Sequence, residues 1–211
     1  MLKAMLPKDF SLQNSFIAVD GNSISTEVYG NPGYVRALCL RLNSLGYNVT
    51  FDVSQPVSGQ TTIAMINDGA ATIDPLLKPT LTNILIINEG GNDIYYGATP
   101  EQAERRMRDY CLARKLAGWF VVVIDTWPRG NGYPPGNSNT AQYAAAILEY
   151  NKLVRCRWNE YANLYFDARL HVPEIQPNTA YMTAPDVTHP NTDGCCLIGS
   201  RLADFLVQQV G

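Results

Sequence analysis

Short apolar runs alternate along the chain with longer stretches in which apolar residues recur every three or four positions. The short runs are rich in β-branched residues and are typical of buried strands, whereas the longer stretches are typical of amphipathic helices. The predicted strands cover residues 16–20, 48–53, 83–88, 119–125 and 164–167. Because strands that alternate with helices build a parallel sheet covered on both faces, the pattern predicts an α/β fold.

Residues that begin or end helices mark several boundaries. Thr99 and Gln102 have the spacing of a capping box, with Pro100 at the first helical position. Gly46 and Gly118 each follow the last apolar position of a helix, as helix-ending glycines do. The predicted helices cover residues 33–45, 61–71, 100–118, 138–162 and 192–210. Together, the elements predict a doubly wound three-layer α/β/α sandwich with a central five-stranded parallel sheet in flavodoxin-like order.

The length and organisation of the chain predict one domain. Its 211 residues fall within the usual range for a single domain, and neither a polar linker nor an internal repeat divides them. We expect the domain to span residues 1–211, with residues 1–14 as an N-terminal extension. A segment dense in glycine, proline and asparagine, residues 127–139, is expected to form an exposed connection or a rim of the site.

Charge and composition argue against several classes of partner. The formal net charge is −3, and Lys and Arg are scattered apart from Arg105, Arg106 and Arg108, which we interpret as a solvated helix face. Binding to nucleic acid is therefore not expected. The longest apolar run, residues 119–124, is far shorter than the ~20 residues of a membrane span. The first residues lack the apolar core of a secretory signal, which leaves the compartment open and favours the cytoplasm.

Cysteine and histidine usage argues against disulfides and metal. The chain has five cysteines, and Cys195 and Cys196 are adjacent, so reduced and buried thiols are expected rather than a disulfide framework. His171 and His189 are the two histidines, and no C-x-x-C pair accompanies them, so no metal is predicted.

Neither a P-loop nor a dinucleotide fingerprint occurs, and we expect no cofactor. The sequence leaves the oligomeric state open.

Candidate chemistry gathers at the carboxyl ends of the predicted strands, where doubly wound folds bind ligands. The segments are residues 21–23, 58–59 and 90–93 after the first three strands, and 186–189 before the last helix. They supply a hydroxyl, an imidazole, a carboxylate and amide donors, which are the parts of an acyl-transfer site. We therefore predict Ser23 as the nucleophile and His189 as its general base.

The remaining site residues follow from what that chemistry needs. Asp186 lies three residues before His189, a spacing that on a turn lets its carboxylate hold Nδ1 of the ring while Nε2 faces Ser23. The tetrahedral intermediate also needs donors for its oxygen. The backbone N–H groups of Ser23 and Gly59 and the side-chain amide of Asn92 are predicted to form this oxyanion hole.

Other polar and aromatic residues near these segments receive simpler interpretations. Asp20 and Asp93 compete for the role of the orienting carboxylate, but neither precedes a histidine by three residues, so both are expected to brace turns. His171 is interpreted as an ordinary surface or loop residue. Five aromatic residues on loops at the catalytic edge are expected partly to hold a sugar ring or an acyl chain and partly to pack. They are Tyr95, Tyr96, Trp127, Tyr133 and Tyr181.

The segments together resemble the SGNH hydrolases, also called GDSL esterases, whose functional Ser, Gly, Asn and His stand in four separate blocks. The corresponding blocks here are residues 19–24 (VDGNSI), 57–62 (VSGQTT), 90–93 (GGND) and 186–190 (DVTHP). The third and last blocks are fairly specific, and all four occur in order across nearly the whole chain. The resemblance implies a three-layer α/β/α fold, a shallow open site, and hydrolysis of esters or thioesters without a metal.

One residue departs from the family pattern, because Asn22 stands where the family usually has Asp immediately before the serine. That position is not a triad member.

The leading hypothesis is hydrolysis of short acyl esters, with O-acetyl groups on carbohydrate as the first choice of substrate. The alternatives are a longer-chain lipase or thioesterase, acyl transfer to an alcohol, and a non-catalytic binding domain that retains the fold. An α/β-hydrolase is disfavoured because the Gly-x-Ser-x-Gly motif is lacking around Ser23.

Overall fold

The computed structural model describes residues 10–28, 30–127, 140–175, 180–183 and 188–210. At its centre lies a parallel five-stranded sheet in the order β2-β1-β3-β4-β5. The strands are β1 (Asn14–Gly21), β2 (Asn48–Asp52), β3 (Thr82–Asn88), β4 (Phe120–Ile124) and β5 (Leu164–Phe166). This is the flavodoxin-like order, so the predicted α/β class and strand order are confirmed.

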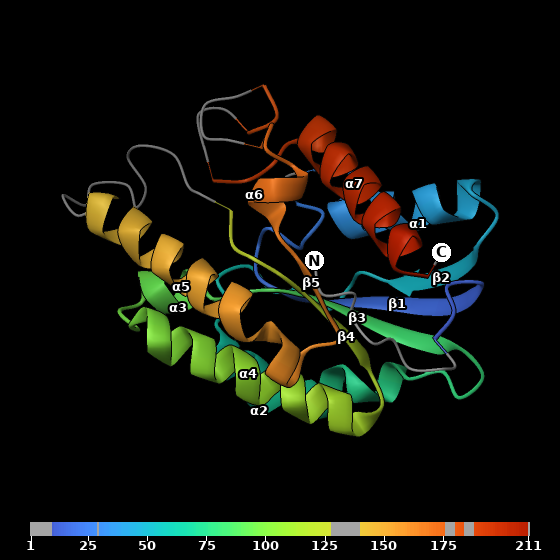
Figure 1. Cartoon of the computed structure of the whole chain (residues 1–211), viewed down its shortest axis with the longest axis horizontal. Coiled ribbons are helices and arrows are strands. Elements are labelled where there is room, and N and C mark those ends of the chain that lie inside the picture. Colours follow the sequence, from blue (N-terminus) through green and yellow to red (C-terminus); the bar gives the residue numbers. More distant parts are fainter. Residues whose placement is uncertain (1–9, 29, 128–139, 176–179, 184–187, 211) are drawn as a thin grey trace.

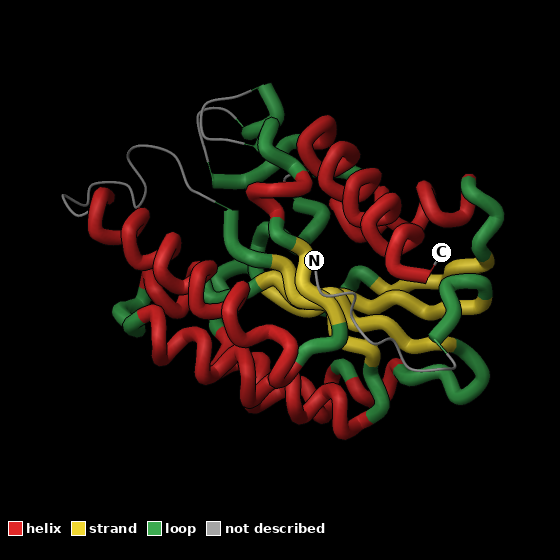
Figure 2. The backbone as a smooth tube through the Cα atoms, in the orientation of Figure 1, coloured by secondary structure: helices red, strands yellow, loops and turns green. Residues whose placement is uncertain are grey.

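The helices are α1 (Tyr34–Ser44), α2 (Thr62–Thr72), the 3-10 turn η1 (Asp74–Leu76), α3 (Gly91–Tyr95), α4 (Pro100–Ala117), α5 (Thr140–Tyr161), α6 (Ala168–His171) and α7 (Thr192–Val210). They cover both faces of the sheet, which gives the three layers visible in Figures 1 and 2. On one face α1 packs against α7, and α6 contacts α7. On the other face α4 packs against both α2 and α5.

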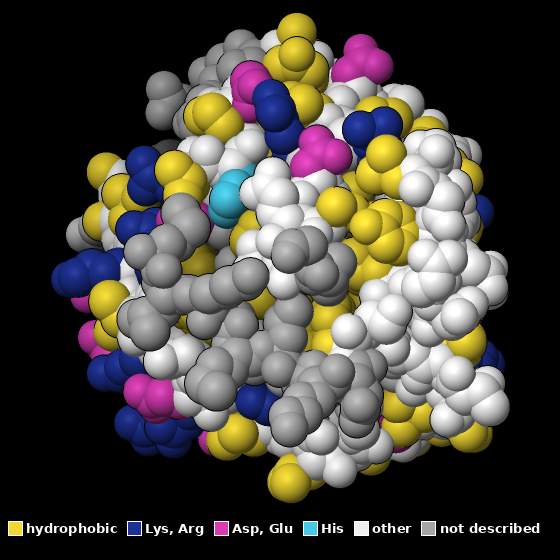
Figure 3. All heavy atoms as spheres, turned by 45° about the vertical axis from the view of Figure 1, so that its right-hand side comes forward, with side chains coloured by type: hydrophobic (Ala, Val, Ile, Leu, Met, Phe, Trp, Pro, Cys, Tyr) yellow, Lys and Arg dark blue, Asp and Glu magenta, His cyan; other side chains and the backbone are white. Residues whose placement is uncertain are grey.

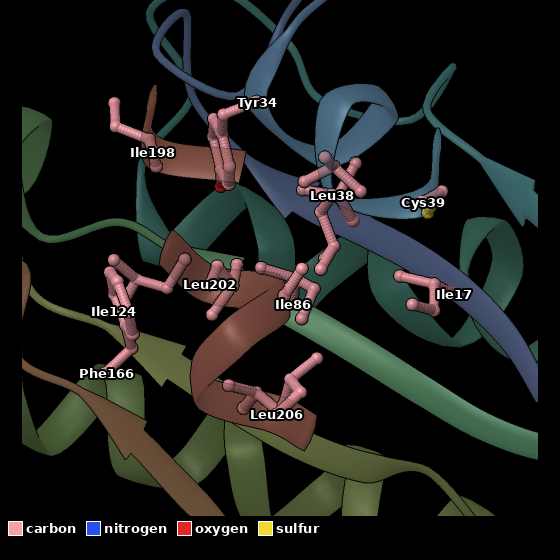
Figure 4. Packing of buried hydrophobic residues seen from close by; sticks show 14 of the residues in the cluster. Ile17, Tyr34, Leu38, Cys39, Ile86, Ile124, Phe166, Ile198, Leu202 and Leu206 are labelled. Carbon is pink, nitrogen blue, oxygen red and sulfur yellow. The ribbon is translucent and has the colours of Figure 1, made fainter. Parts of the chain in front are cut away.

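Two apolar clusters fill the spaces between the sheet and its helices. Because successive side chains of a strand point to opposite faces, Ile17 of β1 belongs to the cluster under α1 and α7, whereas Ala18 belongs to the other. Figure 4 shows the first cluster, in which Leu38 of α1 and Leu202 of α7 pack over Ile86 of β3. Burial on both faces explains why the strands read as nearly continuous apolar runs.

The predicted element boundaries agree with the observed ones to within two residues. The capping box is present: Thr99 Oγ1 accepts the Gln102 N–H at 3.3 Å, and Gln102 Oε1 accepts the Thr99 N–H at 2.9 Å. Gly118 ends α4 in a left-handed conformation, with a φ of 114°. The pattern does not predict η1, α3 or α6, because elements of three to five residues carry no helical periodicity.

The cysteine prediction is partly wrong. All five cysteines are free, and Cys39, Cys111 and Cys195 are buried as expected. Cys156, however, is exposed, and Cys196 is only half-buried. The exposure of Cys156 has a simple cause, since residues 155–157 lie on the solvent side of α5.

The arginine trio on α4 does not form a purely solvated face. Arg106 is half-buried and pairs with Asp93 at 2.9 Å, while Arg105 is exposed and Arg108 lies 3.9 Å from Asp109. On the face shown in Figure 3, basic side chains lie among acidic ones rather than in one patch. Across the described segments, no helix is both long enough and apolar enough to cross a bilayer.

Candidate active site

Ser23 lies in a tight turn directly after β1. The Ser25 N–H donates to the Asn22 carbonyl at 2.9 Å, which closes the turn. Asn22 Oδ1 accepts the Ile24 N–H at 3.0 Å, a local side-chain bond that asparagine often makes in turns. Thr26 Oγ1 donates to the Ser23 carbonyl at 2.8 Å. These bonds hold the backbone of Ser23 while its side chain remains half-buried at the sheet edge.

His189 lies in the segment that leads into α7. An isolated antiparallel bridge joins Met182 to Pro190, and the Thr183 N–H donates to the His189 carbonyl at 2.8 Å. This strand-like pairing fixes the backbone at His189 and at the residues that directly follow it. The residue is only 8% exposed, so the ring is held within the protein rather than on its surface.

Ser23 and His189 meet although 166 residues separate them in sequence. His189 Nε2 lies 2.8 Å from Ser23 Oγ, which is within the range for direct proton transfer. Nε2 can accept the hydroxyl proton when the ring proton resides on Nδ1. Asp186, the residue predicted to hold Nδ1, lies outside the described residues, and its role stays a prediction.

The predicted oxyanion donors lie after β1, β2 and β3. Gly59 is exposed in the turn between β2 and α2 and has a φ of +79°, a region that favours glycine. Within the described segments, neither the Ser23 N–H nor the Gly59 N–H has a hydrogen-bond acceptor. Asn92 Nδ2 donates to the carbonyl of Gln60 at 2.8 Å, which holds the amide beside Gly59. Their joint action on one oxygen stays a prediction.

Asp20, at the end of β1, ties the nucleophile turn to the Gly59 turn. Its carboxylate accepts the Gly21 N–H at 2.8 Å, Gln60 Nε2 at 3.2 Å and the Tyr110 hydroxyl. Burial raises the pKa of this carboxyl, and the three hydrogen bonds oppose that rise. Asp20 therefore braces the turns, as predicted.

Asp93 is the second bracing carboxylate. Its Oδ2 accepts the backbone N–H and the hydroxyl of Thr62, each at 2.8 Å, at the start of α2. Its Oδ1 accepts Arg106 Nη1 at 2.9 Å. Asp93 thus joins α2, α3 and α4 immediately after Asn92, so it fixes the position of the third block, and the prediction that it braces a turn is confirmed.

Glu89 is a buried residue of the site edge that the sequence reasoning missed. It follows β3 and is fully buried, and its Oε1 accepts the N–H groups of Gly90 at 2.9 Å and Asn92 at 3.2 Å. Burial raises the pKa of its carboxyl to about 8. The available signal was a glutamate between an apolar strand and a Gly-Gly pair, where a charge has no solvent to face.

Two of the predicted rim aromatics are exposed beside the Gly59 turn. The rings of Tyr95 and Tyr96 meet edge to face, with centroids 5.0 Å apart. The Tyr96 hydroxyl lies 3.9 Å from the place that a Cβ on Gly59 would occupy. A hollow of about 350 Å³ continues from Tyr96, and its walls are both polar and apolar. Its lining also includes Thr61, Ile63, Asp93, Gln102 and Arg106.

The other predicted rim aromatics are not exposed there. Trp127 is 1% exposed and packs near Tyr34 in the α1/α7 cluster, and Tyr181 is half-buried against the same cluster. Tyr133 lies outside the described residues. The exposed aromatic surface near Gly59 therefore comes from the α3 region.

The second histidine has a structural place. His171 ends the short helix α6, is half-buried, and stacks on Phe166 with ring centroids 4.8 Å apart. Burial lowers the pKa of its imidazole. It is a packing residue rather than the loop residue expected. Within the described part of the chain, no three His, Cys, Asp or Glu side chains are placed to hold a metal ion.

Sequence comparison places the site within a known family pattern. Residues 15–195 match the model of the GDSL-like Lipase/Acylhydrolase family. The matched range contains Ser23, Gly59, Asn92 and His189. Among curated proteins, none matches the chain.

Solved structures share the fold across almost the whole chain. An acetylxylan esterase from Geobacillus stearothermophilus aligns with a TM-score of 0.64 at 16% identity, covering 95% of this chain and 97% of that one. EstA, a psychrotrophic esterase from Pseudoalteromonas sp., gives 0.67 at 15% identity, with coverages of 93% and 99%. LAE5, an alpha/beta hydrolase enzyme from the Lake Arreo metagenome, gives 0.72 at 17% identity, with coverages of 95% and 97%. At such identities the likeness establishes the shared fold.

Proposed function

The chain belongs to the GDSL-like lipase/acylhydrolase family, and from this premise we propose that it is a serine esterase that hydrolyses short-chain acyl esters. Ser23 is the nucleophile, His189 the general base and Asp186 the carboxylate that orients it. The N–H groups of Ser23 and Gly59 and the amide of Asn92 form the oxyanion hole. The observation that carries the proposal is the 2.8 Å distance between His189 Nε2 and Ser23 Oγ.

Acylation follows from that distance. Ser23 Oγ attacks the ester carbonyl carbon while its proton passes to His189 Nε2, and the carbonyl oxygen becomes an oxyanion. The imidazolium that forms is stabilised by the carboxylate of Asp186. Each oxyanion donor lowers the barrier by about 3 to 4 kcal/mol. His189 then returns the proton to the leaving alcohol as the C–O bond breaks, which leaves an acyl group on Ser23.

Deacylation repeats these steps with water as the nucleophile. His189 Nε2 takes a proton from a water molecule, the water oxygen attacks the acyl carbon, and the same donors hold the second oxyanion. The Ser23 oxygen leaves as the proton returns to it, and the carboxylic acid is released. The residues of the site supply every proton transfer, and no cofactor enters the scheme.

We favour O-acetyl groups on carbohydrate as the substrate. Support comes from the exposed rings of Tyr95 and Tyr96 next to Gly59, since aromatic faces pack well on sugar rings. The hollow beside Tyr96 also includes Gln102 and Arg106, whose side chains can donate hydrogen bonds to sugar hydroxyls. The acetylxylan esterase with the same fold points in the same direction.

The first experiment compares turnover of p-nitrophenyl acetate, butyrate and decanoate by the wild type, Ser23→Ala and Ser44→Ala. Ser44 is an exposed serine at the end of α1 and serves as the matched control. We expect Ser23→Ala to lose nearly all turnover and Ser44→Ala to keep it. Wild-type rates no higher than those of Ser23→Ala would contradict the enzyme proposal and favour a binding domain.

Chain-length preference and labelling separate the remaining alternatives. Acetate should turn over faster than decanoate, and the reverse order would favour a lipase or thioesterase. Transfer of the acyl group to added alcohol in preference to water would identify an acyltransferase. A fluorophosphonate probe should add one adduct, located on Ser23 by peptide mapping. Release of acetate from acetylated xylan, but not from the same polymer with Ser23→Ala, tests the proposed substrate class.

A further inference from the structure

The fully buried carboxyl of Glu89 contacts the backbone that carries Asn92. Its Oε1 receives the N–H groups of Gly90 at 2.9 Å and Asn92 at 3.2 Å, so one carboxyl oxygen holds the first turn of α3 in place. The Glu89 carbonyl is held as well, because it accepts the hydroxyls of Tyr150 at 2.8 Å and Thr126 at 3.3 Å. Backbone and side chain of Glu89 are therefore both fixed.

The side chains of Glu89 and Asn22 start from neighbouring strand ends, because Asn88 of β3 and Gly21 of β1 are register partners. The side-chain amide of Asn22 favours the ionised form of the Glu89 carboxyl, although no hydrogen bond of normal geometry joins the two groups. Glu89 Oε2 and Asn22 Nδ2 are both buried, and within the described segments neither has another partner. Asn22 Oδ1 is already engaged with the Ile24 N–H, so the amide nitrogen must be the atom that faces Glu89.

We propose that Glu89 and Asn22 form a matched carboxyl–amide pair that positions the nucleophile turn against the oxyanion turn. Glu89 is a positioning residue: it acts through Asn22 on Ser23 and through the backbone on Asn92. The proposal rests on the proposed function, because positioning has meaning only if Ser23 and Asn92 act together. It also gives a role to Asn22, the amide that stands where the family usually has Asp, since a buried carboxyl follows the neighbouring strand.

The proposed pair predicts that aspartate does not fit at position 22, directly before the serine. Aspartate at position 22 would keep the bond to the Ile24 N–H but would put a second carboxyl against Glu89 Oε2 in a site without solvent. Because burial already raises the pKa of Glu89, the two carboxyl groups could not both ionise there, and the pair would have to hold a proton between them. Glu89→Gln would exchange the two roles, because the glutamine amide would donate a hydrogen bond to the aspartate introduced by Asn22→Asp.

The test is a double-mutant cycle with Asn22→Asp, Glu89→Gln and the double variant. We expect kcat for p-nitrophenyl acetate to fall about 10- to 100-fold in Asn22→Asp, with KM little changed, because the turn is displaced and substrate contacts remain. Glu89→Gln places two amides face to face and should also lose activity. The double variant should recover most of the kcat of the wild type.

The control uses Glu104, a second buried carboxyl that lies on α4 and pairs with Arg157 at 3.2 Å. Glu104→Gln should not rescue Asn22→Asp. Urea midpoints are measured for every variant, because the recovery in the double variant should appear in stability too. That readout remains valid even if the wild type hydrolyses no ester, so failure of the proposed function and failure of the pair are distinguishable.

Each outcome decides the proposal. If Asn22→Asp does not fold, recovery of a folded protein by adding Glu89→Gln carries the same conclusion. Additive losses in the double variant, or rescue by Glu104→Gln to the same extent, contradict the pair. An Asn22→Asp variant as active and as stable as the wild type contradicts it as well.

Discussion

Asn92 allows the proposed oxyanion hole to be tested at the scale of one residue. Its side-chain amide is held by the Gln60 carbonyl, and its backbone is held by Glu89, so truncating the side chain leaves the turn supported. We expect Asn92→Ala to lower kcat for p-nitrophenyl acetate about 10²- to 10³-fold. KM should change little, because the donor acts on charge that develops after the ester has bound. A variant that raises KM at unchanged kcat would assign Asn92 to substrate binding instead.

Asp125 gives the stability of the protein a pH dependence of known sign. Burial raises the pKa of its carboxyl to about 7, and its Oδ1 accepts the Ala168 N–H at 2.6 Å. An unfolded aspartate titrates near about pH 4, so between about pH 4 and pH 7 the folded state keeps a proton that the unfolded state has lost. The contribution of this group is therefore full below about pH 4 and is lost as the pH rises through about 7.

The measurement compares the free energy of unfolding of the wild type and Asp125→Asn in urea at several pH values. The wild type should lose stability relative to the variant by up to about 1.4 kcal/mol per pH unit across that window. Above about pH 8 the difference should be constant. A difference that grows in favour of the wild type with rising pH would show that the folded state stabilises the ionised carboxylate.

At the scale of elements, the start of α4 depends on its capping box. Thr99→Ala removes the oxygen that accepts the Gln102 N–H, and helix caps of this type contribute about 1 kcal/mol. The free energy of unfolding in urea should fall by that amount. Thr99→Ser retains the oxygen and is the matched control, with a change expected within about 0.5 kcal/mol. Equal losses in both variants would show that the γ-methyl group of Thr99, rather than its hydroxyl oxygen, is responsible for the effect.

The contact between α1 and α7 depends on a glycine. A Cβ on Gly199 would lie 2.5 Å from the Tyr34 carbonyl oxygen and 2.6 Å from the Leu38 nitrogen, both backbone atoms that no rotamer change can move. Gly199→Ala should therefore push the helices apart and lower the free energy of unfolding by about 1 to 3 kcal/mol. Ser200→Ala, one residue along the same helix, should stay within about 0.5 kcal/mol. Thermal and urea unfolding check both values.

Elements with a strong local signal were predictable, and those defined by distant contacts were not. The apolar runs of the strands and the capping box at Thr99 depend on neighbours in sequence, so their positions follow from the pattern. Helix α3 has five residues, and its first turn is held by the buried carboxyl of Glu89. The burial of Trp127 likewise depends on Tyr34, a residue of α1, which no local pattern reveals.

At the scale of the whole molecule, the residue types that meet at the site were predictable from the sequence, but the hydrogen bonds that hold them in place were not. The pairing of Ser23 with His189 follows from their residue types and from the rule that strand ends meet at one edge. The bracing of Asp20 by Tyr110 joins residues 90 positions apart, and the sequence between them carries no sign of it. The catalytic roles of all five site residues stay predictions, and so does the one-domain organisation of residues 1–211; the residues are Ser23, Gly59, Asn92, Asp186 and His189.

That one-domain organisation has a direct test, because the tryptophans report on different layers. Trp127 belongs to the α1/α7 cluster, whereas Trp119 and Trp158 belong to or pack against the opposite cluster. Both clusters are built on alternate side chains of the same strands, so loss of packing in one cluster would disturb the strands that carry the other. The layers should therefore unfold together.

The experiment uses Trp127→Phe, whose fluorescence then reports only on the layer of α4 and α5. Its urea transition should coincide with that of far-UV circular dichroism and with the loss of p-nitrophenyl acetate turnover, which depends on the turn between β1 and α1 and on the segment before α7. Three coincident curves identify one cooperative unit. If turnover were lost at a lower urea concentration while fluorescence and dichroism stayed native, the edge carrying Ser23 and His189 would open separately, and residues 1–211 would not unfold as a single domain.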